Sequence, residues 1–307
     1  MSLLKSAILS ATENRWLRER AVRTPFVRRA VSRFMPGETV EDALAAARAL
    51  GVGAVLTRLG ENLANPGEAE EVERHYLDVL NRVQVEGLDV EISVKLTQLG
   101  LDFSRAQCEE NLHALAERAR SYGNWVWVDM ESSAYTEVTV DIYKALRAKF
   151  PETGLCVQSY LYRTAADVEA LISIGAGVRL VKGAYLEPPD KAYQKKEDVD
   201  ESFFRLAQRL LSADARERNV RSIFGTHDPV LIRRIEEHGR ERRLLPPEVE
   251  FQMLYGIRRG EQLRLAAAGY RFRVLISYGE AWFPWYMRRL AERPANVLFV
   301  VKSLFNG

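Results

Sequence analysis

The chain is predicted to fold as an α/β protein, a (β/α)8 TIM-like barrel, and three observations carry this prediction. Eight short runs rich in β-branched, aromatic and other apolar residues follow one another, each bounded by Gly, Pro or Asn. The distance from one run to the next leaves room for one helix in every gap. Several runs are apolar without strict alternation, which is typical of parallel strands covered by helices.

The predicted elements alternate along the whole chain. Apolar residues recur at helical spacing in four segments between the runs. One composition persists throughout, so we expect a single domain over residues 1–307, with residues 1–50 as a helical lead-in. The predicted strands begin at Gly51, Val90, Asn124, Gly154, Val178, Ser222, Val249 and Phe272, and the helical segments at Glu41, Cys108, Glu137 and Asp167.

Composition excludes several classes of protein. The 307 residues are 47% hydrophobic, and 44 basic against 42 acidic side chains leave a net charge of +2 with no basic arm for nucleic acid. The two cysteines, Cys108 and Cys156, have neither zinc-site spacing nor the number that a disulfide framework needs. No apolar run reaches the roughly 18 residues of a spanning helix. We therefore expect a protein of the reducing cytoplasm, without a recognisable export signal.

Charged side chains are predicted to gather at one end of the barrel. In a (β/α)8 barrel the carboxyl ends of the strands share one mouth, where chemistry is located. Like and unlike charges brought together there are costly unless they pair with each other or bind a ligand. The cluster therefore indicates an anionic ligand. Its expected members are the cations Lys95, Arg179 and Lys182 and the carboxylates Glu61, Asp129 and Glu131.

Individual residues at these strand ends have alternative interpretations. Lys95 beside a carboxylate could form a Schiff base. His227 could bind a metal, but the other three histidines fall on predicted helices away from the mouth, so we expect no metal. Gly183 and Gly225 either allow close approach of the backbone to a phosphate or flavin or serve ordinary turns.

A predicted helix follows the eighth strand, with Pro284 in its first turn. Arg288 and Arg289 come one turn later. Adjacent residues on a helix diverge by about 100 degrees, so this pair is either a solvated basic edge or a clamp for a carboxylate that lies beside the helix.

Taken together, the strings VKLTQL, DMES, VQSYLYRT, RLVKGAY, THD, EFQMLYG and YMRRLAERPAN resemble proline dehydrogenase, in the monofunctional bacterial form. The resemblance covers nearly the whole chain. It implies a distorted barrel with noncovalent FAD, and a C-terminal helix over the barrel mouth.

The resemblance also implies an activity and partners. It implies oxidation of L-proline to Δ1-pyrroline-5-carboxylate by hydride transfer from ring C5 to flavin N5, with electrons passed to a membrane quinone. The protein would then be cytoplasmic, with at most a peripheral contact at the inner membrane, and pyrroline-5-carboxylate dehydrogenase would be a candidate partner.

Roles carry over from the family motifs to residues of this chain. The resemblance makes Asp129 and Arg179 catalytic, with Arg179 beside flavin N5, and pairs Glu61 with Arg288 as a gate. It assigns the cofactor to Met130, Gln158, Arg179, Lys182, Gly183, Ala184, Thr226 and His227, and the substrate to Lys95, Tyr185, Leu275, Trp285, Arg288 and Arg289.

Two of these positions depart from the family pattern. Leu275 and Trp285 stand where the family commonly has tyrosine, so both lose a phenolic hydroxyl. The carboxylate and flavin motifs are intact, which is the pattern expected when chemistry is retained and substrate preference changes. A dehydrogenase of hydroxyproline or another substituted cyclic amino acid is therefore the first alternative. A Schiff-base barrel lyase and a noncatalytic relative also stay open.

Overall fold

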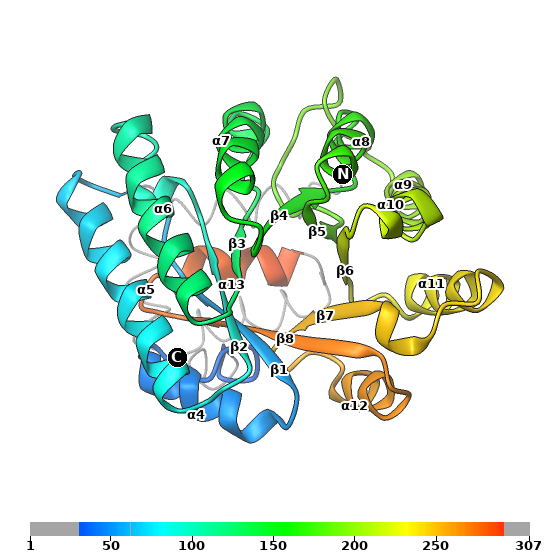
Figure 1. Ribbon diagram of the computed structural model, residues 1–307, viewed down its shortest axis with the longest axis horizontal. Coiled ribbons are helices and arrows are strands. Elements are labelled where there is room, and N and C mark those ends of the chain that lie inside the picture. Colours follow the sequence, from blue (N-terminus) through cyan, green and yellow to red (C-terminus); the bar gives the residue numbers. More distant parts are fainter. Residues whose placement is uncertain (1–30, 62, 292–307) are drawn as a thin grey trace, which may run out of the picture.

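The computed structural model describes residues 31–61 and 63–291, in which eight parallel strands close into one barrel in chain order (Figure 1). Number, order and position of the predicted strands are confirmed. The strands are β1 (Gly53–Arg58), β2 (Val90–Val94), β3 (Val126–Val128), β4 (Thr153–Gln158), β5 (Gly177–Val181), β6 (Arg221–Gly225), β7 (Glu250–Leu254) and β8 (Arg271–Tyr278).

The barrel closes between its first and last strands. β1 and β8 pair in parallel from Gly53 opposite Arg273 to Arg58 opposite Tyr278. All five residues of β2 are buried, because alternate side chains point into the barrel and toward the surrounding helices. This two-sided burial explains the apolar, weakly alternating sequence of the strands.

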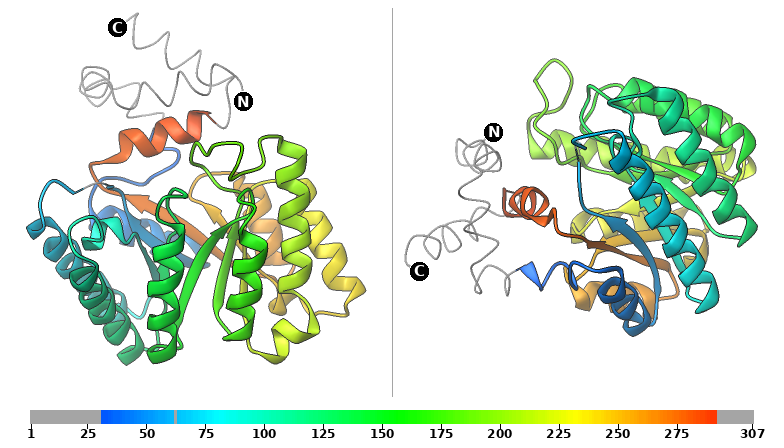
Figure 2. Two further views of the ribbon diagram at one scale, coloured as in Figure 1. Left: turned by 90° about the horizontal axis from the view of Figure 1, so that it is seen from above. Right: turned by 90° about the vertical axis from the view of Figure 1, so that its left-hand side faces the viewer.

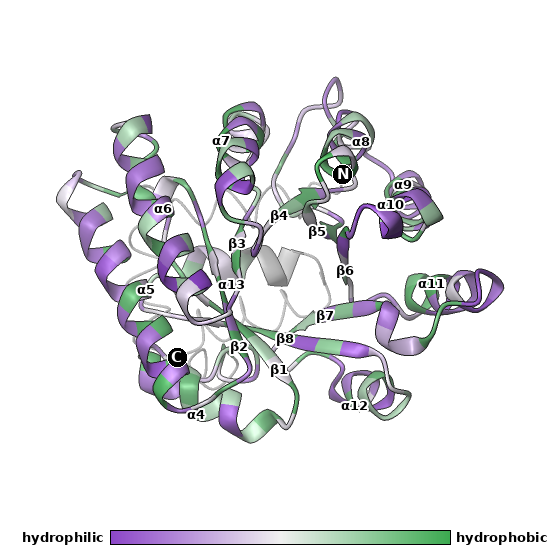
Figure 3. Ribbon diagram, in the orientation of Figure 1, coloured by the Kyte–Doolittle hydropathy of each residue, from purple (hydrophilic) through white to green (hydrophobic). Residues whose placement is uncertain are grey.

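Helices surround the barrel, and several of them have apolar residues on the side toward it and polar residues on the outer side (Figure 3). The four helices predicted from helical spacing are confirmed as α4, α6, α7 and α8, and the one predicted after the eighth strand as α13. The described helices are α4 (Val40–Leu50), α5 (Gly67–Val85), α6 (Arg105–Ser121), α7 (Thr136–Lys149), α8 (Thr164–Ser173), α9 (Lys196–Leu210), α10 (Ala213–Glu217), α11 (Pro229–Glu241), α12 (Arg259–Ala267) and α13 (Trp282–Ala291), with 3-10 turns η2 (Thr97–Leu99) and η3 (Pro246–Glu248).

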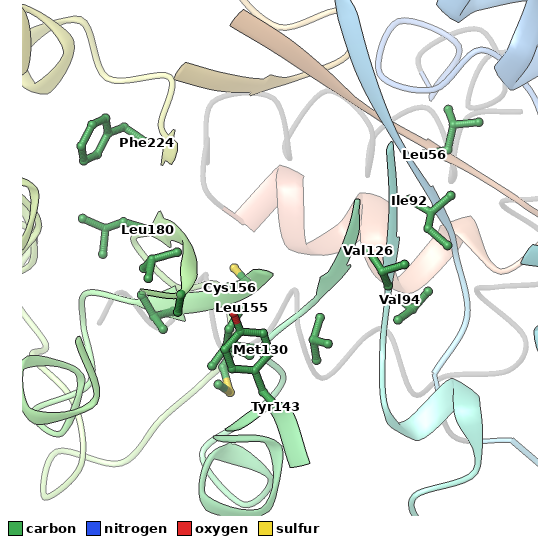
Figure 4. Packing of buried hydrophobic residues seen from close by; sticks show 14 of the residues in the cluster. Leu56, Ile92, Val94, Val126, Met130, Tyr143, Leu155, Cys156, Leu180 and Phe224 are labelled. Carbon is green, nitrogen blue, oxygen red and sulfur yellow. The ribbon is translucent and has the colours of Figure 1, made fainter. Parts of the chain in front are cut away.

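The main core fills the space between the strands and these helices (Figure 4). Ile92, Leu155 and Phe224 from three strands are fully buried in it, together with Tyr143 of α7. The Tyr143 hydroxyl donates to the carbonyl of Thr153 at 3.0 Å, so its one polar atom is satisfied. This packing holds the strand ends, and the side chains that follow them, in fixed positions.

Charged side chains close the amino end of the barrel. Arg221 contacts Glu91 at 2.7 Å and binds both oxygens of Glu250, at 2.7 and 3.0 Å. Arg273 lies 3.3 Å from Glu91 and 3.5 Å from Glu250, and Trp127 donates to Glu91 at 2.6 Å. Burial alone would lower the pKa of Arg221, but its contacts with Glu250 and Glu91 raise it, so the guanidinium stays charged.

The opposite end of the barrel is covered by α13, as the resemblance implies (Figure 2). This helix begins at Trp282, which confirms the expected place of Pro284 in its first turn. Part of the lead-in packs on it: the Trp282 indole donates to Glu38 at 3.0 Å, and the Phe34 and Tyr286 rings lie 6.1 Å apart. The rest of the predicted lead-in, residues 1–30, lies outside the described residues.

Within residues 31–61 and 63–291 there is no helix with the length and apolar character needed to cross a bilayer.

Candidate active site

One large cavity, of about 730 Å³, opens at the carboxyl ends of the strands. This volume is in the range of small-molecule and cofactor sites. Every residue to which the resemblance assigns a role, and whose side chain the structure describes, lines it. These are Glu61, Lys95, Asp129, Met130, Gln158, Arg179, Lys182, Gly183, Ala184, Tyr185, Thr226, His227, Leu275 and Trp285.

Asp129 and Arg179 form an ion pair at the bottom of the cavity, between Arg179 Nη2 and Asp129 Oδ1. Ser93 joins both, donating to Asp129 at 2.9 Å and accepting from Arg179 at 2.9 Å. On the other side Arg179 Nη1 donates to Gln252 Oε1 at 3.2 Å, and its guanidinium lies 5.6 Å from the Trp127 ring. Contacts from several strands therefore hold this buried cation in one orientation.

Lys95 presents its ammonium to the same cavity. Its Nζ lies 3.6 Å from Asp129 Oδ2, and the residue is only 9% exposed. Burial alone would lower the pKa of Lys95, but attraction to Asp129 and Glu61 outweighs burial and raises it. The side chain is therefore a fixed positive charge, suited to binding an anion.

Glu131 corrects one expectation about the cluster. It does not line the cavity but is buried behind it, where it accepts hydrogen bonds from Thr97 N at 3.2 Å and Thr97 Oγ1 at 2.7 Å. Burial raises the pKa of Glu131 to about 6, although the bonds from Thr97 and the charge of Lys95 oppose the rise. The chain leaves the strand geometry after β3, so the two-residue spacing from Asp129 does not bring Glu131 into the mouth.

The predicted gate is described on one side. Glu61 accepts a hydrogen bond from the Tyr185 hydroxyl at 3.3 Å, which joins the ends of β1 and β5. Arg288 and Arg289 belong to α13, but their side chains lie outside the described residues. The Glu61–Arg288 pair and the arginine clamp therefore stay predictions.

Lys182 lies in a mixed cluster at the edge of the cavity. Its Nζ is 2.5 Å from Asp200 and 3.0 Å from Asp228, and Lys196 contacts the same two carboxylates. Burial would raise the pKa of Asp228, but its hydrogen bond with Lys182 and their attraction outweigh burial and lower it to about 2. Two cations and two anions therefore sit at a site open to a polar ligand.

Gly183 is required by a neighbouring ring. Its φ of 110° is in a region that other residues rarely adopt, and a Cβ there would lie 2.3 Å from the Tyr160 ring. At Gly225 a Cβ would come within 2.9 Å of Val181. Close packing of the protein against itself is therefore a sufficient reason for both glycines.

His227 has a protein partner for one ring nitrogen. Its Nε2 accepts from the backbone N–H of Leu254 at 2.9 Å, which leaves the proton on Nδ1. The part of the chain that the structure describes contains no group of three or more His, Cys, Asp or Glu side chains placed to hold a metal ion.

Two buried glutamine amides each leave one polar atom unpaired within the described residues. Gln158 donates from Nε2 to the carbonyl of Met130 at 3.3 Å, and its Oε1 has no partner. Gln252 accepts from Arg179, and its Nε2 has no partner. Both residues line the cavity, so the site offers a buried acceptor and a buried donor to a polar ligand.

Sequence reasoning missed several lining residues. Phe34 comes from the lead-in, and Tyr193 and Gln194 from the connection between β5 and α9. Irregular segments carry no periodicity, so nothing in the sequence pointed to these three. Thr57 and Ser277, polar residues within β1 and β8, could have been noticed as exceptions in apolar runs.

Comparisons with known proteins identify the family of this chain and support its fold. The family model for proline dehydrogenase matches residues 40–302. Proline dehydrogenase 1 of Bacillus subtilis subsp. natto is 35% identical over 305 residues, covering 98% of this chain and 99% of that protein. Proline dehydrogenase of Deinococcus radiodurans is 34% identical over 283 residues, covering 90% of each.

A solved structure supports the fold alone. The crystal structure of proline utilization A from Bdellovibrio bacteriovorus, inactivated by N-propargylglycine, superposes with a TM-score of 0.80 at 20% identity. The match covers 93% of this chain and 37% of that one. With a family model matched over most of its length and relatives of similar length at about one-third identity, this chain belongs to the proline dehydrogenase family, whose members are oxidoreductases acting on proline.

Proposed function

We propose that this chain oxidises L-proline to Δ1-pyrroline-5-carboxylate with noncovalently bound FAD. The observation that carries the proposal is that one cavity unites Lys95, Asp129 and Arg179 with the predicted cofactor residues, in a chain of this family. A bound flavin would supply the two-electron acceptor, at its N5, for the hydride that leaves ring C5 of the substrate.

The cavity suits a flavin on grounds of its own chemistry. The unpaired Gln158 Oε1 and Gln252 Nε2 provide one acceptor and one donor, which complement a ring edge that carries both N–H and C=O groups. Met130, Gly183, Ala184, Thr226 and His227 would complete the cofactor site, and Lys182 would face its polar tail.

Arg179 and Lys95 would each stabilise a different negative charge. Arg179 is held by Asp129, Ser93 and Gln252. Its guanidinium would stabilise the negative charge that develops on the flavin ring as the flavin is reduced. Lys95 would bind the substrate carboxylate, with Arg288 and Arg289 of α13 as further cations. Tyr185 would pack against the substrate ring, and its bond to Glu61 would hold it there.

The Schiff-base alternative requires an unprotonated lysine. The pKa of Lys95 is raised, chiefly because Asp129 and Glu61 overcome the effect of burial, so its amine is held in the protonated form. This observation favours an anion-binding role over a covalent one.

A quinone as electron acceptor, with peripheral contact at the inner membrane of a cytoplasmic enzyme, is supported only by the family resemblance. The same holds for pyrroline-5-carboxylate dehydrogenase as a partner. Electrons would then pass to the quinone, and the product to this dehydrogenase.

Anaerobic mixing with L-proline tests the proposal. Protein saturated with FAD should lose its flavin absorption when L-proline is added, and acid precipitation should leave the flavin in the supernatant. No bleaching by any cyclic amino acid would exclude dehydrogenase activity, and a carbonyl substrate trapped on Lys95 by borohydride would support the lyase instead. Flavin found in the acid pellet would contradict noncovalent binding.

A dehydrogenase of hydroxyproline or another ring-substituted proline is the second candidate. Leu275 and Trp285 both line the cavity, and Trp285 is 8% exposed. A leucine in place of tyrosine leaves an apolar wall and space beside the ring.

We therefore expect the double variant Leu275→Tyr, Trp285→Tyr to shift preference toward L-proline, because the tyrosines would narrow that wall while the carboxylate contacts stay common to all substrates. The expected change in relative kcat/KM is about tenfold, the size typical of one methylene or hydroxyl in a pocket. Proline, hydroxyproline and N-alkyl prolines are compared in both proteins, with Leu263→Tyr on the exposed side of α12 as a control. An unchanged ratio would show that specificity lies elsewhere.

A further inference from the structure

Glu131 is a buried carboxylate outside the cavity in which the substrate and the cofactor are proposed to bind. It is 4% exposed and does not line the cavity. Both oxygens accept hydrogen bonds from the same residue, Thr97, one from its backbone N–H at 3.2 Å and one from its hydroxyl at 2.7 Å. Isolating a carboxylate from water is costly, so a buried one with such specific contacts calls for a reason.

Thr97 opens the 3-10 turn η2, which follows Lys95 almost directly. The residue that precedes the turn, Leu96, makes no side-chain hydrogen bond to the first N–H groups of the turn. Glu131, which comes from the neighbouring strand's end, satisfies one of them. The Leu99 N–H in turn donates to the Lys95 carbonyl at 3.3 Å, so the backbone of Lys95 is part of the same turn.

Lys95 lies between two ties to the chain segment after β3. On one side the Asp129 N–H donates to the Val94 carbonyl at 2.8 Å, beyond the last register pair of β2 and β3. On the other side Thr97 donates twice to Glu131. The segment after β3 therefore constrains both parts of Lys95. Asp129 attracts its ammonium, and Glu131 fixes the turn to which its backbone belongs.

We infer that Glu131 is a positioning residue for Lys95, which fixes the turn after β2 so that the lysine ammonium points into the cavity. The inference rests on the proposed function, in which Lys95 binds the substrate carboxylate. Loss of the Thr97 contacts would let the Lys95 ammonium move, and the protein would then bind the substrate more weakly.

The test compares KM and kcat for L-proline in four variants made from the FAD-loaded protein. Glu131→Leu removes both acceptors and should raise KM at least tenfold while kcat stays within threefold. Glu131→Gln keeps a carbonyl for the Thr97 N–H, and the hydroxyl can rotate to meet the amide, so KM should return to within threefold of wild type. Thr97→Val, which removes one hydrogen bond, should raise KM about threefold to tenfold.

Glu236→Leu is the matched control, because Glu236 is a buried carboxylate of α11 paired with Arg264. This variant should have a lower free energy of unfolding and an unchanged KM.

A double-mutant cycle separates positioning of Lys95 from general loss of structure. If Glu131 acts through Lys95, Glu131→Leu should cost nothing further in KM once Lys95→Met is present. Additive effects in this cycle would overturn the inference, as would a KM for Glu131→Leu within threefold of wild type. Should Glu131→Leu fail to fold, the same cycle with Thr97→Val decides. Wild-type protein that does not oxidise proline would contradict the proposed function itself, and that result is seen before any variant is compared.

Discussion

Replacing Arg179 with methionine is expected to slow flavin reduction by proline about 10²- to 10³-fold, the cost typical of removing one stabilising group at developing charge. The guanidinium is 2% exposed and held by Asp129, Ser93 and Gln252, so no other described cation can take its place without rearrangement. Loss of this charge should also lower the flavin reduction potential, because a nearby cation favours the reduced, more negative form.

Stopped-flow reduction and a redox titration measure these two effects. The potential distinguishes an electrostatic role from simple misfolding, since a damaged site loses flavin but has no reason to shift the potential of what remains. Arg234→Met is the matched control. Arg234 pairs with Glu201 on the outer helices, so this substitution removes the same charge at a place away from the cavity. A potential that is unchanged or higher in Arg179→Met would contradict the place assigned to Arg179.

Replacing Arg221 with methionine is expected to lower the free energy of unfolding by about 3–5 kcal/mol, the typical cost of removing one partner from a buried ion pair. Arg221 makes the short contacts to Glu91 and Glu250, whose side chains are 5% and 4% exposed. Without it, Arg273 would be the one cation left against these two carboxylates among the described residues, at 3.3 and 3.5 Å, and Glu91 would keep its bond from the Trp127 indole.

Urea unfolding of the apoprotein measures this loss, and kcat/KM of the folded holoenzyme should stay within about twofold because the network lies at the end of the barrel opposite the cavity. Arg216→Met serves as a control, since Arg216 makes one long contact of 3.8 Å with the exposed Glu248. A loss below about 1 kcal/mol in Arg221→Met would place this network among ion pairs of surface strength.

Of these two arginines, the sequence alone predicts the place of Arg179 but not the partners of Arg221. Arg179 was identified from its strand-end string and lines the predicted cavity. Arg221 begins a strand, and nothing near it in the sequence indicates a partner. Its carboxylates come from β2 and β7, so they meet it only because the barrel closes.

The eight strands, five of the helices and the common mouth followed from local patterns. Strand and helix periods are properties of neighbouring residues, and parallel strands necessarily present their carboxyl ends on one side. Family motifs then identified fourteen residues that line one cavity.

Directions of side chains beyond the strand ends depended on packing in three dimensions. Asp129 and Glu131 are two residues apart, and the sequence pattern does not distinguish them, yet Asp129 faces Lys95 and Glu131 faces Thr97. Phe34 reaches the cavity because the lead-in packs on α13, which no pattern in either segment predicts. Local periodicity determines which residues are strand or helix, whereas loop paths and long-range pairs are determined by the closure of the barrel and the free energy of burying each charge with a partner.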